Sequence, residues 1–201
     1  METREELFAL TEQYLQSTEE KYYIADTVGA STNVVIFEDC PTRDDIAAAK
    51  PVSAMRTAST GKELFDEDTA DTSGVAVMYI SNVPLYPTDE PTWKLIGPLE
   101  AIRLAPKPAS EHLRKAFGIK MKKLIESEEI KLISFKREIF KRYYDDFRAT
   151  ADEQLISLLD ERLKTGDLKI IPFPTHKIEQ IKRFEKIYND FIAAFDALTK
   201  G

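Results

Sequence analysis

The feature that most constrains this chain is a stripe of apolar side chains that follows Ser110 at intervals of three and four residues. Side chains at this spacing lie on one face of an α-helix, so the stripe predicts helical structure over about residues 111–147, either unbroken or broken near Glu128. The stretch 109–171 contains no proline, which would interrupt a helix. The stripe consists of Leu113, Phe117, Met121, Leu124, Leu132, Phe135, Ile139, Tyr143 and Phe147.

An unbroken helix over 111–147 would be about 55 Å long at about 1.5 Å per residue, roughly three times the usual length in globular domains. Apolar residues off the main stripe, such as Ile125 and Tyr144, widen the face that has to be covered. Other helices or a second subunit are needed to bury such a face. The stripe therefore predicts a helical bundle and favours association.

Two further helices are expected toward the C-terminus. Thr150 with Glu153 matches a capping box, in which the two side chains satisfy free backbone N–H groups at a helix start. This predicts a helix over 151–165, ended by the glycine that follows it. Prolines make 168–173 extended, and Thr175 then caps a last helix with an apolar face.

The first half of the chain has a different character, because prolines and glycines separate short apolar runs. The runs 34–37 and 75–80 are rich in β-branched residues and predict strands. A short helix is expected between them, capped by Thr42. Two polar stretches, 52–62 and 66–74, predict exposed loops.

The sequence therefore predicts an α+β fold that is mainly helical. Residues 1–109 form a loop-rich α+β region with one leading helix at 4–17 and a few short strands, and residues 110–201 form a bundle of long helices. The proline-rich segment 105–109 marks the boundary. The first part carries 9 Lys and Arg against 19 Asp and Glu, whereas the second carries 19 against 16. Parts of opposite charge can pair head to tail in an oligomer, or they can be two solvated surfaces.

Cysteine usage and hydropathy indicate a reducing compartment. The chain has a single cysteine, Cys40, so no internal disulfide can form. Its N-terminus is polar and acidic, without the basic and apolar regions of a signal peptide. No stretch approaches the roughly 18 apolar residues of a membrane span. We therefore expect a cytoplasmic protein without a membrane partner.

Nucleophilic catalysis has weak support in the sequence. Cys40 would need a nearby base, and His112 and His176 are the two histidines of the chain. No glycine-rich turn surrounds Cys40, which is more typical of a small buried residue. Both histidines fall in the first turn of a predicted helix, where a surface or capping role is expected.

Standard metal and nucleotide motifs are missing from the sequence. Two histidines and one cysteine are too few for a standard zinc site. The acidic run 66–74 lacks the spacing and the terminal glutamate of an EF-hand. Residues 59–62 resemble the end of a phosphate-binding loop, but the upstream glycine is absent. We therefore predict no catalytic residue, no metal ligand and no cofactor.

The strongest candidate binding feature is a basic and aromatic segment at 120–142. Cations above a buried aromatic stripe can hold the phosphates of a nucleic acid. The same pattern also describes an amphipathic helix with a solvated side, and Glu138 would repel phosphate. The candidate nucleic-acid-binding residues are Lys120, Lys122, Lys123, Lys136, Arg137, Lys141 and Arg142.

Three functions are open at this point. The leading hypothesis is a non-catalytic structural or assembly subunit, an adaptor in a larger complex or particle, with protein partners or self-association. It follows from the predicted long helices, the two parts of different charge and the polar loops, which can order against neighbours. The second hypothesis is nucleic-acid binding through 120–142. The third is an enzyme of unrecognised type that uses Asp39, Asp44 or Asp45.

Overall fold

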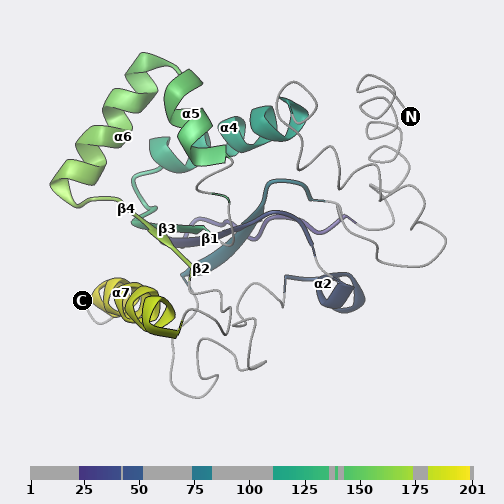
Figure 1. Ribbon diagram of the computed structural model, residues 1–201. Helices are drawn as coiled ribbons and strands as arrows, with labels where there is room; N and C mark the ends of the chain where they lie inside the picture. The colour runs from purple at the N-terminus through teal and green to yellow at the C-terminus, as the bar shows by residue number, and fades with distance from the viewer. Residues whose placement is uncertain are drawn as a thin grey trace.

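The computed structural model describes most of the second half of the chain and three parts of the first half (Figure 1). The described residues are 23–41, 43–51, 74–82, 111–135, 139, 143–173 and 181–199. The elements within them, in chain order, are β1 (Val34–Glu38), α2 (Arg43–Ala48), β2 (Val75–Tyr79), α4 (Glu111–Glu126), β3 (Leu132–Phe135), α5 (Asp145–Thr150), α6 (Glu153–Thr165), β4 (Lys169–Pro172) and α7 (Ile181–Thr199).

These strands form one parallel sheet in the order β2-β1-β3-β4. Val34 pairs with Val75 on one side and with Leu132 on the other, and Leu132 also pairs with Lys169. β1 is buried along its whole length. This is expected of an apolar, β-branched strand inside a parallel sheet that is covered on both faces. Parallel strands that alternate with helices along the chain define an α/β fold.

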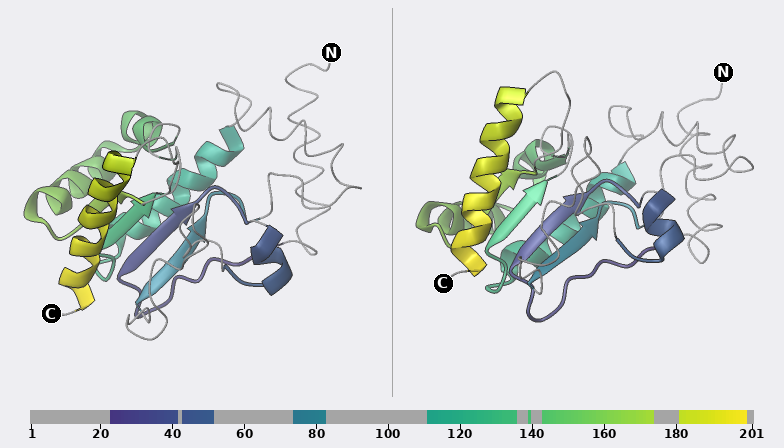
Figure 2. Two further views of the ribbon diagram at one scale, coloured as in Figure 1. Left: turned by 60° about the horizontal axis from the view of Figure 1, so that its bottom comes forward. Right: turned by 90° about the horizontal axis from the view of Figure 1, so that it is seen from below.

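Helices cover both faces of the sheet, which gives three layers (Figures 1 and 2). α4, α5 and α6 lie on one face, and α7 lies on the other. The chain passes from β1 to β2 and then returns past β1 to β3. Because such crossovers are right-handed, the two connections lie on opposite faces. Accordingly, α2 lies on the same side as α7, and α4 lies on the opposite side (Figure 1).

The core between the sheet and α4 is built around packed aromatic rings. The ring centroid of Phe117 in α4 lies 5.2 Å from that of Phe37 and 5.9 Å from that of Phe135. Tyr143 and Phe147 complete the cluster at 5.7 and 6.1 Å from Phe117. All five side chains are buried. Aromatic pairs of this kind add about 0.5 to 1.5 kcal/mol each to the stability that burial supplies.

A second core fills the space between the sheet and α7. Phe191 and Phe195 of α7 share this core with Ile36 of β1. The ring of Phe173, which follows β4, lies 5.2 Å from that of Phe191. Tyr79 of β2 belongs to the same cluster. This core therefore includes a buried phenol near the carboxyl end of the sheet.

The segment before β1 covers the outer edge of β2. The N–H of Ile24 donates to the carbonyl of Asn82 at 2.9 Å. The N–H of Thr27 donates to the carbonyl of Val77 at 2.9 Å, and its side chain accepts from the N–H of Val77 at 2.8 Å. An uncovered edge strand offers unpaired backbone groups to other chains. The segment before β1 hydrogen-bonds with these groups of β2, so they are not available to another chain.

A buried arginine holds the turn between α4 and β3. Nη1 of Arg162 donates to the carbonyls of Ile125 and Ser127 at 2.7 and 2.8 Å. Nη2 donates to the carbonyl of Ile130 at 2.6 Å, and Nε donates to Asp167 at 3.0 Å. A guanidinium can be buried when hydrogen bonds compensate the loss of water. The contacts of Arg162 fix the end of α4 to the start of β3.

The predicted α+β fold with a C-terminal bundle of long helices is wrong, because the fold is α/β. The stripe over 111–147 is not one helix: α4 ends at Glu126 and β3 follows. Leu132 and Phe135 fit the helical spacing, yet in the structure they pair with β1 as strand residues. Four residues are too few to separate a helical period from a strand period. Pairing with β1, which no local pattern reveals, decides the structure there.

Several local predictions are confirmed. β1 and β2 match the predicted strands 34–37 and 75–80, and α2 matches the short helix expected between them. α6 matches the predicted helix 151–165, and Gly166 ends it with a φ of 78°. Only glycine adopts this left-handed conformation readily. The extended segment 168–173 contains β4.

The cap of α6 differs from the prediction. Asp152, rather than Thr150, accepts a hydrogen bond from the N–H of Gln154 at 2.9 Å. Thr150 ends α5 instead, and its hydroxyl donates to the carbonyl of Asp146 at 2.8 Å. Both residue types are good caps. The separate helix α5, which the apolar stripe did not reveal, decides which of them is used.

Other predictions fall outside the described residues. They concern the leading helix, the polar loops and the proline-rich boundary, at 4–17, 52–62, 66–73 and 105–109. Strands that precede and follow this boundary belong to one sheet. Among the residues that the structure describes, no helix is both long and apolar enough to cross a membrane.

Candidate functional site

The connections that leave β1 and β3 diverge at the carboxyl end of the sheet. Phe37 pairs with Phe135, so the two strands end nearly level. After β1 the chain reaches α2 on the α7 side, whereas after β3 it reaches α5 on the α4 side (Figure 1). In open α/β sheets, ligands bind in the crevice where neighbouring connections separate in this way. The topology therefore predicts a site at the carboxyl ends of β1 and β3.

Three carboxylates lie at this end of β1, and all are buried. Glu38 is the last residue of β1, Asp39 follows it, and Asp45 belongs to α2. Their exposed fractions are 3%, 5% and 0%. Each takes part in polar or electrostatic contacts, which offset the cost of removing a charge from water. Charged side chains are rarely this buried, so three of them together distinguish this edge of the sheet.

Tyr79 places a phenol beside two of these carboxylates. It pairs with Glu38 in the register of β1 and β2, and its side chain is fully buried. The hydroxyl makes no hydrogen bond of normal geometry, although Asp45 lies close enough to raise its pKa through a side-chain interaction. Burial raises the pKa of Tyr79 far above its ordinary value, and the charges of Asp45 and Glu38 raise it further. The phenol therefore stays protonated and can donate a hydrogen bond.

Glu38 and Tyr79 both belong to the α7 side of the sheet. Side chains alternate between the two faces along a strand. Ile36, two residues before Glu38, packs in the core beneath α7, and Tyr79 packs in the same core. α2, which carries Asp45, also lies on this side (Figure 1). Glu38, Asp45 and Tyr79 thus form one group, which we call the carboxylate–tyrosine cluster.

A group of hydrogen bonds holds the carboxyl end of β2. The ammonium of Lys120 lies 2.8 Å from Asp26 Oδ2, and it donates to Asn82 Oδ1 at 2.7 Å. It also donates to the carbonyl of Tyr79. Oδ1 of Asp26 accepts from the N–H of Tyr79 and from Nδ2 of Asn82, both at 2.9 Å. Asp26, Asn82 and Lys120, which we call the β2 lock, thus fix both backbone groups of Tyr79.

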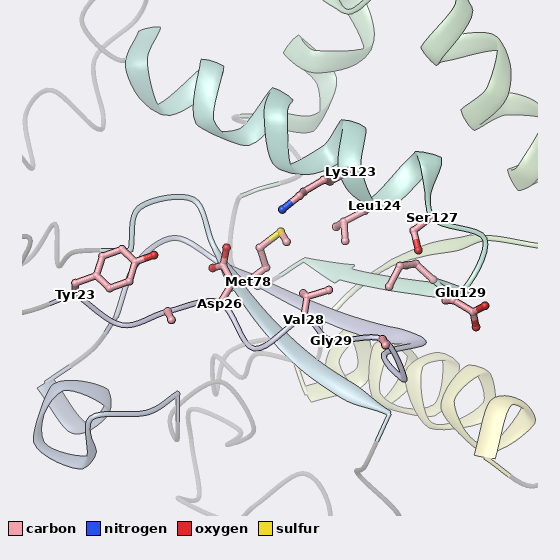
Figure 3. Close-up of a pocket in the computed structure, with 12 residues that line it drawn as sticks. Tyr23, Asp26, Val28, Gly29, Met78, Lys123, Leu124, Ser127 and Glu129 are labelled. Carbon is pink, nitrogen blue, oxygen red and sulfur yellow. The ribbon is translucent and has the colours of Figure 1, made fainter.

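A separate hollow of about 420 Å³ lies between α4 and the segment before β1 (Figure 3). Met78, Leu124 and Ile130 are its buried apolar residues. Lys123 and Glu129, both exposed, bring opposite charges to its rim. In Figure 3, the side chain of Lys123 reaches from α4 toward Met78. None of the three buried carboxylates lines this hollow, so it is distinct from the carboxylate–tyrosine cluster.

The structure places three of the cations that the sequence suggests for nucleic-acid binding, and they have different surroundings. Lys120 is engaged in the β2 lock. Lys122 is exposed and lies 3.7 Å from Glu126, whereas Lys123 lies at the hollow. The continuous helix 120–142 is absent, because α4 ends and β3 follows. Nucleic-acid binding stays a prediction. Four of its residues lie outside the described ones: Lys136, Arg137, Lys141 and Arg142.

The candidate nucleophile is buried. Cys40 is 2% exposed, which confirms the expectation of a small buried residue. His176 and the side chain of His112 lie outside the described part of the chain. Within the described ranges, no three His, Cys, Asp or Glu side chains converge closely enough to hold a metal ion by themselves.

The sequence suggested some residues of the site and missed others. Of the carboxylates considered for an enzyme, Asp39 and Asp45 lie at the carboxyl end of β1, and Asp44 is exposed on α2. Glu38 and Tyr79 were not selected, because only the pairing of β1 with β2 brings them together. An acidic pair directly after an apolar, β-branched run is the signal for Glu38, once the strand is placed in a parallel sheet.

Comparison with known proteins gives no further guide to this site. No family model matches this chain, and no curated protein or solved structure is significantly similar to it. A function can therefore be inferred only from the residues and their arrangement.

Proposed function

We propose that this chain is an enzyme that depends on a divalent cation, which binds between Glu38 and Asp45 at the carboxyl end of β1. The observation that carries this proposal is the burial of both carboxylates beside the unpartnered hydroxyl of Tyr79. Burial of an ionised group costs several kcal/mol, and groups in such environments are concentrated at sites that bind or react with ligands. The divergence of the connections after β1 and β3 supports the same place independently.

A divalent cation fits the chemistry of these two side chains. Carboxylate oxygens are the protein ligands that Mg²⁺ prefers, and it ordinarily takes one or two of them. Its remaining positions hold water and oxygens of the substrate, so two protein ligands are sufficient.

A cation at this position assists reactions in which an oxygen of the substrate gains negative charge. It polarises a phosphoryl or carbonyl oxygen, and it lowers the pKa of a bound water molecule. Hydrolysis or transfer of a phosphoryl or acyl group belongs to this class. We therefore place the proposed enzyme among the cation-assisted hydrolases and transferases.

Cation binding is tested on the purified full chain. Mg²⁺ and Mn²⁺ are titrated by calorimetry, and thermal unfolding is followed with and without each ion. At a cation concentration about 100 times Kd, binding to the folded state alone adds about 2.7 kcal/mol to the free energy of unfolding. For a chain of this size, that raises Tm by about 5 to 10 °C. A folded protein that shows neither heat of binding nor a rise in Tm contradicts the proposal.

Three variants separate the proposed ligands from general charge effects. Glu38→Gln and Asp45→Asn keep the shape of each side chain and remove its charge, so we expect both to abolish the cation-dependent rise in Tm. Asp44→Asn removes the same charge from an exposed position in the same helix, and we expect it to keep the rise. An equal loss in all three variants would indicate a non-specific electrostatic effect and no defined site.

The other functional hypotheses stay predictions. Assembly into a larger complex drew on the predicted bundle of long helices, which the α/β fold replaces. Nucleic-acid binding drew on a continuous helix over 120–142. Light scattering tests the first, and a gel shift at low salt, where phosphate contacts are strongest, tests the second. We also propose a cytoplasmic location, because a single buried thiol at Cys40 suits a reducing compartment.

A further inference from the structure

Two hydroxyl groups in the described part of the chain are buried without a hydrogen-bond partner, those of Tyr79 and Ser134. Both side chains are fully buried. A buried donor that lacks an acceptor is costly, and native structures keep few such groups. Each of the two therefore needs a specific explanation.

The two hydroxyls differ in their position along the sheet. Both belong to strands next to β1, and both lie on its α7 side, because Tyr79 packs in that core and Ser134 alternates with Leu132, which also does. Tyr79 is level with Glu38 at the carboxyl end, whereas Ser134 is level with Ile36, two residues deeper in the sheet. Tyr79 therefore adjoins the proposed cation site, and Ser134 lies farther from it.

The hydroxyl of Tyr79 is suited to donate a hydrogen bond to a ligand. A phenol is an ordinary hydrogen-bond donor at neutral pH, and this one is fully buried with its hydroxyl unpaired. The β2 lock fixes the backbone on both sides of the residue. Fixed donors of this kind, aimed at a ligand oxygen in a site shielded from water, are how enzymes stabilise negative charge.

We propose that the hydroxyl of Tyr79 donates a hydrogen bond to an oxyanion that is coordinated by the cation between Glu38 and Asp45. This inference rests on the proposed function, and it defines the ligand as an anion with phosphate or carboxylate oxygens. Two carboxylates alone repel an anion, but a bound divalent cation neutralises their charge and has coordination positions left for an oxygen of the anion. The anion therefore binds after the cation, and Tyr79 contacts the anion and not the metal.

The test compares Tyr79→Phe with Ser134→Ala in the full chain. Each substitution removes one buried, unpartnered hydroxyl and leaves the rest of the core intact, so neither lowers Tm in the absence of ligand. Binding of inorganic phosphate and of acetate is measured by calorimetry, with and without saturating Mg²⁺. The two anions distinguish a phosphate ligand from a carboxylate ligand.

In the wild-type chain, we expect at least one of the two anions to bind, and only in the presence of Mg²⁺. Tyr79→Phe weakens this binding about tenfold, because a hydrogen bond to a charged group contributes at least that much to affinity. It leaves the affinity for Mg²⁺ unchanged. Ser134→Ala changes neither affinity, which controls for the loss of a buried hydroxyl as such.

Three results would overturn the inference. The first is an anion affinity that is equal in Tyr79→Phe and the wild type. The second is a wild-type chain that binds Mg²⁺ but neither anion. The third is a lower Tm of Tyr79→Phe without ligand, which would reveal a structural partner of the hydroxyl. Failure of Mg²⁺ itself to bind is a different result, because it refutes the proposed function, and the titration without anion detects it separately.

Discussion

On the α4 side of the sheet, the buried guanidinium of Arg162 donates to three backbone carbonyls and to Asp167. On the α7 side, the hydroxyls of Tyr79 and Ser134 are equally buried and have no partner. The carboxylate of Glu38 is buried beside Tyr79 on that same side. Buried polar groups are therefore present on both faces of one sheet. The guanidinium on the α4 side has its hydrogen bonds made, whereas the two hydroxyls on the α7 side do not.

The difference indicates which buried polar groups stabilise the chain and which are suited to bind a ligand. A buried polar group supports the fold only when its hydrogen bonds are made. Groups that are buried and unsatisfied weaken the fold by themselves, and proteins tolerate them where function requires them. Substitutions that remove these buried polar groups should therefore destabilise the chain on the α4 side and leave its stability unchanged on the α7 side.

The largest effect is expected from the aromatic core on the α4 side. Phe117→Ala removes a ring that contacts Phe37, Phe135 and two further aromatic side chains. We expect the free energy of unfolding to fall by about 3 to 5 kcal/mol, as for other buried Phe-to-Ala changes, in urea titrations. Ile119→Ala is the control, because Ile119 lies in the same helix with 68% of its surface exposed. Its effect should stay within about 0.5 kcal/mol; similar losses in the two variants would contradict this assignment of the core.

The next largest effect tests the satisfied side of the comparison directly. Arg162→Met keeps much of the side-chain volume but leaves the carbonyls of the α4–β3 turn without their donor. We expect the free energy of unfolding to fall by about 2 to 4 kcal/mol, whereas Tyr79→Phe on the other face lowers it not at all. Lys131→Met is the control, because water and salt screen its partly exposed ion pair with Asp167, so its loss should cost much less. Equal stabilities of Arg162→Met and the wild type would show that water replaces the guanidinium.

A smaller effect is expected at the β2 lock, which joins the edge of the sheet to α4. Lys120→Met removes the donor to Asp26 and Asn82, and we expect a loss of about 1 to 2 kcal/mol. The amide of Tyr79 should also exchange with solvent faster, because Asp26 is held less firmly. Lys122→Met, at an exposed position two residues away, should change neither quantity. An unaltered exchange rate in Lys120→Met would show that the lock does not hold Tyr79.

Much of the local structure on both faces follows from the sequence. β1 and β2 are short β-branched runs between turn residues, and α6 has a clear apolar period and a glycine cap at Gly166. β3 could not be recognised, because Leu132 and Phe135 fit the helical stripe as well as they fit a strand. Without β3, the alternation of strands and helices that predicts a parallel sheet was incomplete. The error in one four-residue element therefore changed the predicted fold class.

The candidate site was only partly predictable for the same reason. The sequence offered Asp39, Asp44 and Asp45 as carboxylates for an enzyme, and two of them, Asp39 and Asp45, are buried at the carboxyl end of β1. Tyr79 became part of the site only through its pairing with Glu38, across a long stretch of intervening sequence. Its burial and lack of a partner depend on α7 and on the depth of the core, which no local pattern reports. The residue types alone were enough to suggest Asp39 and Asp45. Tyr79 was missed because it joins the site only through contacts between distant segments.

The smallest expected effect concerns pH and the exposed end of the Arg162 network. The hydrogen bond from Lys131 holds the pKa of Asp167 below its ordinary value, and Arg162 lowers it further. A carboxyl whose pKa is lower in the folded state stabilises the fold at pH values above its ordinary pKa of about 4. This contribution is lost as the pH falls through the lowered, folded-state pKa.

We therefore expect the difference in free energy of unfolding between the wild type and Asp167→Asn to shrink between pH 6 and pH 3, as measured by urea titration. The difference should be small throughout, because water and salt screen an exposed carboxylate, and it should shrink further in 1 M NaCl. A difference that is independent of pH would mean that Asp167 is not held ionised by Lys131. In that case the hydrogen bonds of Arg162 to the backbone carbonyls, and not its ion pair, would account for the whole contrast between the two faces.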